Sequence, residues 1–206
     1  MPEIYILRLG RYSEKNVARI LKRNYYIFIV IPLCKMEENI MNNIVIRNAE
    51  PADDQFILRI NEENVEVLSP MDQAKLDFYK RIADILWMID VDGERAAFLI
   101  GIREGADYPN ENFDFFSRTF EKFLYVDRIV IDKPFRKMGL GKKIYEAVKE
   151  HAIADGVTTV TAEVDTEPVY NNASLIFHEG MGFSEVGEQW VRGNSMKVSL
   201  VAWELV

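Results

Sequence analysis

The chain has 206 residues, of which 49% are hydrophobic and 28% charged, and its formal net charge is −8. This composition is typical of a globular protein with one well-packed core and room for a small appendage. The acidic balance disfavours a general nucleic-acid binder, which normally has a basic face. The single cysteine, Cys34, excludes an internal disulfide framework and a cysteine metal cluster. We therefore expect a reducing, cytoplasmic setting and no metal.

The first 40 residues differ from the rest of the chain. They carry a net charge of +3, which leaves −11 for the remainder. Their apolar run YYIFIVIPL (25–33) is shorter than the roughly 20 residues of a membrane-spanning helix, and it lies too far from the start for a signal peptide. We therefore interpret 1–40 as an extension without an assigned role, with Met36 and Met41 as alternative starts. Residues 42–206 form the domain, and we expect no contact with a membrane.

Hydrophobic periodicity predicts the first elements of the domain. Pro51 begins one helix, Ser69 and Pro70 cap a second, and Asp92-Gly93 joins two apolar strands as a hairpin. The expected elements are a strand at 43–48, helices at 51–64 and 69–83, and two strands within 85–102.

The second half of the domain begins with a long aromatic connection at 103–123, which we expect to be an ordered flap with a short helix. The run FLYVDRIVI (123–131) is the most strand-like in the chain. A helix follows that places Leu140, Ile144, Val148 and His151 on one face and ends at Asp155-Gly156. The remaining expected elements are a strand at 158–165, a short helix at 171–183, and strands near 183–190 and 196–205.

The stretch RKMGLGKK (136–143) predicts an anion site. Glycine costs a helix interior about 1 kcal/mol relative to alanine, so a pair of glycines at a helix start indicates a sharp turn or a close approach. Six basic side chains and one acidic side chain lie between 128 and 143, a cluster of +5 inside an acidic region. Free N–H groups and the positive end of the helix dipole would converge there.

Two familiar phosphate motifs do not fit this stretch. A Walker A loop needs a longer spacing and a Ser or Thr after Gly-Lys, and GLGKK has neither. A dinucleotide-binding turn needs a third glycine, and Ile144 occupies its place.

The pattern that fits is Arg-x-x-Gly-x-Gly, formed by Arg136, Gly139 and Gly141. With IVIDKPFRKMGLG before the helix and NNASLIFHEGMGF in register after it, the sequence resembles the GNAT superfamily of acetyl-CoA-dependent N-acetyltransferases over about residues 42–206. The expected order of elements also resembles that of the family. The resemblance implies an α+β fold, with a mixed, mostly antiparallel central sheet flanked by helices. A plain glycine turn before a surface helix is the competing interpretation.

The resemblance implies a set of residues that bind acetyl-CoA as cosubstrate. Main-chain groups of Ile129, Val130 and Ile131 would pair with the pantetheine arm as an added strand. Arg136 would open the turn, and Asn171 would contact the cofactor arm. Lysine replaces a frequent glycine at 137, where only the main chain is needed. The N–H groups that would hold the pyrophosphate are those of Lys137, Met138, Gly139, Leu140, Gly141 and Lys142.

The resemblance also implies an acid and a base. His178 stands where relatives often have a tyrosine that protonates the departing thiolate, and a histidine can deliver a proton near neutral pH. Packing beside Phe177 is the competing interpretation of His178. Asp127 is the candidate general base, but it could equally pair with Arg128 or Arg136. Glu163 is the other nearby carboxylate, and a chain of waters would also serve.

The implied reaction is acetyl transfer to an amine by direct attack in a ternary complex. The acceptor would be a small molecule or a peptide, bound by a monomer or homodimer between 61–72 and 108–120. Acidic residues in these segments favour a cationic acceptor, although solvated surface acids explain them equally well; they are Glu62, Glu63, Glu66 and Asp107. The alternative function is a non-catalytic sensor or scaffold of the same fold that binds acyl-CoA.

Overall fold

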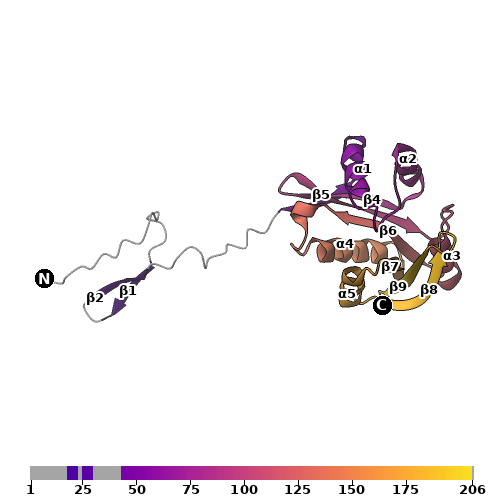
Figure 1. Cartoon of the computed structure of the whole chain (residues 1–206). Helices are drawn as coiled ribbons and strands as arrows, with labels where there is room; N and C mark the ends of the chain where they lie inside the picture. The colour runs from indigo at the N-terminus through magenta and orange to yellow at the C-terminus, as the bar shows by residue number, and fades with distance from the viewer. Residues whose placement is uncertain (1–17, 23–24, 30–42, 206) are drawn as a thin grey trace. The chain divides into compact units, whose positions relative to one another are not determined.

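The computed structural model describes residues 18–22, 25–29 and 43–205. The chain divides into two compact units, Met1–Asn42 and Asn43–Val206. In the first unit, β1 (Ala18–Lys22) and β2 (Tyr25–Ile29) form an antiparallel hairpin (Figure 1). The alternative starts at Met36 and Met41 and the end of the apolar run, 30–33, lie outside the described residues.

The second unit contains seven strands and five α-helices among the residues described (Figure 1). In chain order they are β3 (Ile44–Asn48), α1 (Asp54–Glu62), α2 (Gln73–Ile82), β4 (Ile85–Val91), β5 (Glu94–Arg103), α3 (Glu111–Thr119), β6 (Phe123–Ile131), α4 (Leu140–Ala154), β7 (Thr159–Glu167), α5 (Asn172–Met181), β8 (Ser184–Val191) and β9 (Met196–Glu204). Short 3-10 turns precede α1 (Pro51–Asp53) and α4 (Lys133–Phe135).

The seven strands form one sheet in the order β3-β4-β5-β6-β7-β9-β8. Every neighbouring pair is antiparallel except β6 and β7, which run parallel. The predicted α+β class with a mixed, mostly antiparallel sheet is confirmed. The predicted hairpin between β4 and β5 is also confirmed: Asp92 and Gly93 both have positive φ, at 53° and 85°, as its tight turn requires.

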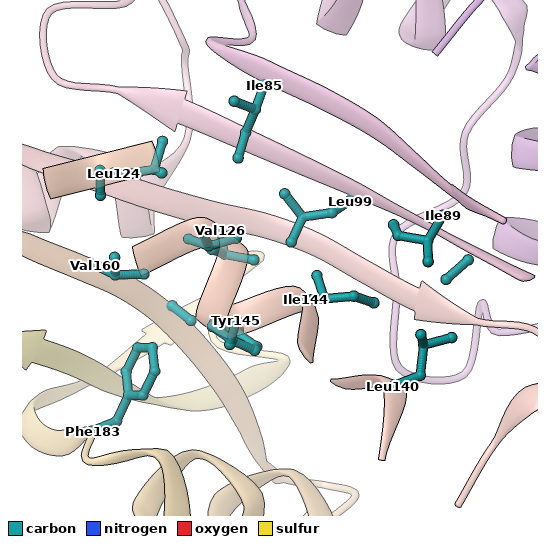
Figure 2. Close-up of a cluster of buried hydrophobic side chains, with 14 of the residues drawn as sticks. Ile85, Ile89, Leu99, Leu124, Val126, Leu140, Ile144, Tyr145, Val160 and Phe183 are labelled. Atoms are coloured by element: carbon teal, nitrogen blue, oxygen red, sulfur yellow. The ribbon is translucent and has the colours of Figure 1, made fainter. Parts of the chain in front are cut away.

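Two hydrophobic clusters cover the two faces of the sheet. Helix α4 packs on one face, where Ile144, Tyr145 and Val148 contact strands β4 to β7 (Figure 2). Helices α1, α2 and α3 cover the other face, around Leu76, Tyr79 and Phe116.

Strands β6 and β7 separate soon after they begin to pair. Their parallel register covers only Phe123–Tyr125 on β6 and Thr159–Thr161 on β7. On its other edge β6 pairs with β5 along its whole length, with a bulge that leaves Asp127 without a direct partner across the ladder. The later part of β6 therefore presents an unpaired backbone edge toward β7.

One sequence prediction about the helices is wrong in detail. The second helix begins at Gln73 with Asp72 as its N-cap, because the hydroxyl and carbonyl oxygens of Ser69 instead accept hydrogen bonds from Arg128. His151 lies on the predicted face of α4, where its half-buried ring is edge-on to Trp87 of β4. Its Nε2 is 2.8 Å from a carboxylate oxygen of Asp84.

Removal of residues 1–40 tests whether the second unit folds by itself. Both hydrophobic clusters are built from side chains between Ile44 and Leu205, so we expect the thermal midpoint and CoA affinity to stay nearly unchanged. Differential scanning calorimetry and a CoA titration measure both. Collapse of the truncated chain would instead mean that the extension supplies part of the core.

Candidate active site

A cleft of about 790 Å³ opens where β6 and β7 separate. Its walls are the unpaired edge of β6, the end of β7, the turn before α4, and helix α5. This volume falls in the range of small-molecule and cofactor sites. The parting of two parallel strands thus leaves room for a ligand between them.

The turn before α4 has the geometry of an anion cradle. Gly139 is the N-cap of α4 and has a φ of 75°, which glycine adopts at little cost. The next three N–H groups, of Leu140, Gly141 and Lys142, have no partner within the helix by the geometry of a first turn. Lys137 also has positive φ, at 64°, so the position where relatives often have glycine keeps the left-handed backbone with a lysine.

Gly141 has a structural reason of its own. A Cβ at this position would lie 3.2 Å from the ring of Phe177 on α5, which is a tight contact, whereas no heavy atom lies within 4 Å of a Cβ at Gly139. Gly141 therefore permits close packing of α4 against α5. At Gly139, by contrast, the space that a Cβ would occupy is empty.

Arg136 fixes the turn through its side chain. Its Nε donates to the carbonyl of Ile131 at 2.9 Å, and its terminal nitrogen donates to Asn64 at 2.9 Å. These contacts link the end of β6 to the segment after α1. The Arg136 side chain is thus held at the turn by two hydrogen bonds within the protein.

Nearly all predicted site residues line this cleft. Those present are Asp127, Ile129, Val130, Ile131, Arg136, Lys137, Gly139, Leu140, Gly141, Lys142, Asn171 and His178. Met138 is the exception: its side chain is 47% exposed and it does not line the cleft. Asn171 caps α5, where its side-chain oxygen accepts from the N–H of Ser174 at 3.2 Å.

His178 is buried on α5 and uses both ring nitrogens. Nδ1 lies 2.8 Å from the carbonyl oxygen of Ser174, so Nδ1 carries the proton and donates it there. Nε2 then accepts from the hydroxyl of Tyr145 at 2.8 Å. Burial lowers the pKa of His178, against the opposing effect of the Ser174 carbonyl, so the ring is neutral at pH 7. Its edge-on contact with Phe177 is also present.

Sequence reasoning missed Tyr145. It lies on α4, 33 positions before His178, and its side chain is fully buried. Burial raises the pKa of its hydroxyl, with the Glu163 carboxylate as a further cause. Its place next to the core residue Ile144 marks it as a packing residue in the sequence, so no local signal identifies it.

Asp127 is held by two partners. One carboxylate oxygen accepts from the hydroxyl of Tyr108 at 2.6 Å, and the other accepts from Nε of Arg128 at 3.2 Å. Arg128 is 3% exposed, and its other nitrogens donate to Asn61 and Ser69. The pairing with Arg128 that competed with the base role is thus present, and both carboxylate oxygens of Asp127 already have hydrogen-bond partners.

Glu163 has the opposite environment. Its Oε2 is buried and has no hydrogen-bond partner within the described residues, as is also true of the Tyr125 hydroxyl and the Thr161 hydroxyl. Thr161 and Tyr125 are opposite each other in the last pair of the β6–β7 ladder. Burial, followed by repulsion from Asp127, raises the pKa of Glu163 to about 8. These unpartnered polar atoms mark the point where the strands part.

A second cavity of about 230 Å³ adjoins the cleft. Asp127, Arg128, Glu163 and Asp165 line both hollows, while Lys75 and Arg192 line only the second. The acids that the sequence placed around the acceptor do not line either hollow: Glu62, Glu63, Glu66 and Asp107 are exposed at the surface. Their exposure fits the alternative interpretation of these four residues as solvated surface acids.

Comparisons with known proteins identify the fold. The family model described as "Acetyltransferase (GNAT) family" matches residues 54–183. The chain belongs to the GNAT acetyltransferase family. The resemblance found in the sequence is therefore confirmed.

Solved structures agree with this GNAT assignment. Three of them are the ribosomal-protein-S18-alanine N-acetyltransferase of Escherichia coli (17% identity, TM-score 0.55, 79% of this chain and 94% of that one), Ard1 from Thermoplasma volcanium (17%, 0.62, 79% and 98%), and yncA from Salmonella typhimurium with its cofactor acetyl-CoA (17%, 0.59, 80% and 95%). No curated protein matches the sequence. None of the helices described in this GNAT chain has the length and apolarity needed to cross a bilayer.

The cleft of this GNAT chain fits acetyl-CoA. The unpaired edge of β6 offers backbone donors and acceptors to an extended amide-containing arm, as a neighbouring strand would. The left-handed Gly139 and the free first-turn N–H groups offer donors to a diphosphate. Family membership makes acetyl transfer the chemistry of this fold, with acceptors that are amines.

Substitution of Gly139 by Asp tests the cradle. The new side chain has open space, so the fold should survive, but its charge would lie where the pyrophosphate is expected. We expect CoA affinity to fall about 100-fold or more, because several charge-assisted hydrogen bonds would be lost. Titration calorimetry with CoA measures this loss.

Gly93→Asp is the matched control for this test, since Gly93 also has positive φ and open space but lies in the β4–β5 turn. Equal CoA affinity in the two variants would contradict the assignment of the cradle.

Proposed function

We propose that the protein transfers the acetyl group of acetyl-CoA to an amine by direct attack in a ternary complex. The observation that carries this proposal is the buried carboxylate of Glu163, whose Oε2 has no hydrogen-bond partner among the residues described and which lines both the cleft and the adjoining cavity. The cleft suits acetyl-CoA and the cavity suits an acceptor. Glu163 therefore lies where an acceptor amine would meet a thioester.

The cofactor contacts follow from the two backbone features of the cleft. Main-chain groups of Ile129, Val130 and Ile131 would bind the pantetheine arm along the free edge of β6. The N–H groups from Lys137 to Lys142 would bind the pyrophosphate, with the side chains of Lys137 and Lys142 adding positive charge at the rim. Asn171 would contact the arm from the start of α5.

Glu163 is the general base in this proposal, in place of Asp127. A base must accept a proton, and Asp127 is already engaged by Arg128 and Tyr108 while Glu163 Oε2 is free of protein partners among the residues described. A pKa of about 8 also brings Glu163 close to the working pH, where general bases are most effective.

The pair formed by His178 and Tyr145 would protonate the departing thiolate. The proton of the Tyr145 hydroxyl lies in the hydrogen bond to His178 Nε2, and both residues line the cleft. The balance of the reaction is then complete. The amine nitrogen forms a bond to the acetyl carbon and loses its proton to Glu163, while the carbon–sulfur bond breaks and the sulfur takes the hydroxyl proton of Tyr145. Solvent then returns a proton to Tyr145 and takes one from Glu163, which restores both groups.

Release of the free thiol of CoA, measured across a panel of amines, tests this function. Turnover with at least one amine is expected, and tight CoA binding without turnover on any amine would favour the sensor alternative. His178→Ala and the nearly isosteric Tyr145→Phe should each reduce kcat and spare CoA affinity. If the protein is a sensor, the parent has no turnover and neither substitution can reduce it.

The pH dependence of turnover tests the role of Glu163. Because its pKa is raised to about 8, the carboxylate is mostly protonated at pH 7 and becomes a base as the pH rises. We expect kcat/KM to rise up to about pH 8 and then level off, with an acceptor whose own ammonium pKa lies well below 7. Glu163→Gln should lower kcat/KM by about 10²-fold or more and abolish this rise of kcat/KM with pH.

Asp127→Asn is the matched comparison. It should keep the rise with pH that Glu163 produces but move it to lower pH, because the repulsion from Asp127 that helps to raise the Glu163 pKa is removed. Retention of the parent pH profile by Glu163→Gln would show that another group is the base.

A further inference from the structure

The cavity beside the cleft has acidic and basic side chains in its wall. One of the acids is Glu111, whose carboxylate accepts from the backbone N–H of Arg192. Glu163 and Asp165 lie on the wall that it shares with the cleft, whereas Lys75 and Arg192 line the cavity alone. An acceptor whose amine reaches Glu163 must therefore leave its remaining atoms near two cations. Arg128 is also present, but its charge is already matched by Asp127.

Lys75 is in an unfavourable place for a lysine. It lies in the first turn of α2, where the positive end of the helix dipole repels a cation. Its side chain is half-buried, and within the described residues no carboxylate lies within 4.0 Å of its ammonium. Its one hydrogen bond there is to the hydroxyl of Ser69, at 3.0 Å. Burial, followed by repulsion from Arg128, lowers its pKa.

Arg192 is the second cation of the cavity and lies in the turn between β8 and β9. Its side chain forms no ion pair among the residues described, although its backbone N–H donates to the carboxylate of Glu111 at 3.0 Å. Its charge also acts on Lys75, whose pKa it helps to lower. Lys75 and Arg192 therefore repel each other, and an anion between them would remove the repulsion.

We propose that the acceptor is a small zwitterion of about amino-acid size, whose amine meets Glu163 and whose carboxylate binds Lys75 and Arg192. The volume of about 230 Å³ is below the usual range for drug-sized ligands, which limits the acceptor to a small molecule. This inference rests on the proposed acetyl transfer, since it assigns the acceptor of that reaction. It replaces the cationic acceptor expected from the sequence, because the acids behind that expectation lie outside the cavity.

Matched pairs of acceptors test the proposal. Each of the common L-amino acids is compared with its carboxamide, which keeps the amine and removes the carboxylate charge. With saturating acetyl-CoA, we expect the best amino acid to exceed its carboxamide in kcat/KM. Lys75→Met, which keeps the apolar stem, should reduce kcat/KM for that amino acid about 10- to 100-fold and change the carboxamide little.

The control is Lys80→Met on the same helix. Lys80 pairs with Asp54 and does not line the cavity, so both acceptors should be unaffected. Better turnover of carboxamides, polyamines or peptides than of every free amino acid would overturn the proposal. An equal effect of Lys75→Met on both members of a pair would also overturn it.

A binding measurement separates this inference from the proposed function. The same amino acids are titrated by calorimetry into the protein saturated with CoA. Binding that Lys75→Met abolishes, in a protein that turns over no amine, would refute acetyl transfer but support the zwitterion site. Binding of none of the amino acids, with turnover of other amines, would refute the zwitterion site alone.

Discussion

The separation of β6 from β7 is the constraint on which the site depends. A parallel pair that ended normally would satisfy both edges of β6, and no extended arm could bind there. The ladder instead stops at Tyr125 and Thr161, and the backbone beyond it remains open on one side. An unpaired strand edge is normally a liability, because it invites pairing with another chain. In this protein helices α4 and α5 enclose that edge, so a ligand of limited size can use it.

The same separation sets the electrostatics of the site. Among the residues described, it leaves three buried polar atoms without protein partners, and the burial of Glu163 there raises the pKa of its carboxyl. The bulge at Asp127 has the opposite effect, since it brings Asp127 and Arg128 into the network of Tyr108, Asn61 and Ser69. The carboxylate of Asp127 thus has a structural role. The carboxylate of Glu163, on β7, can accept a proton in the proposed reaction.

The sequence correctly predicts the structural features that depend on a local pattern of residues. The run at Phe123–Ile131 is a strand over its full predicted length, and Asp92-Gly93 forms the expected turn. The glycine turn, the cap at Asn171 and His178 all lie around one cleft, as the register of the family motif implies. The roles within that cleft depend on partners distant in sequence. Ser69 leaves its expected capping role to bind Arg128, 59 positions away.

The same limit applies to the acceptor. The acidic residues near the expected pocket favoured a cationic substrate. Which charges can contact a substrate depends, however, on whether their side chains line a cavity, and not on their proximity in sequence. Lys75 and Arg192 are 117 positions apart, and only the packing of α2 near the β8–β9 turn brings both to one cavity. Tyr145 likewise acquires its partner only when α4 and α5 pack together.

Amide hydrogen exchange with and without CoA tests the central claim most directly. The account predicts that CoA slows exchange at two places, the second half of β6 (127–131) and the turn at 137–142. The β8–β9 hairpin, which has no part in the cleft edge, should exchange at the same rate in both states. Binding of CoA without any protection of β6 would contradict the claim that the open strand edge receives the cofactor.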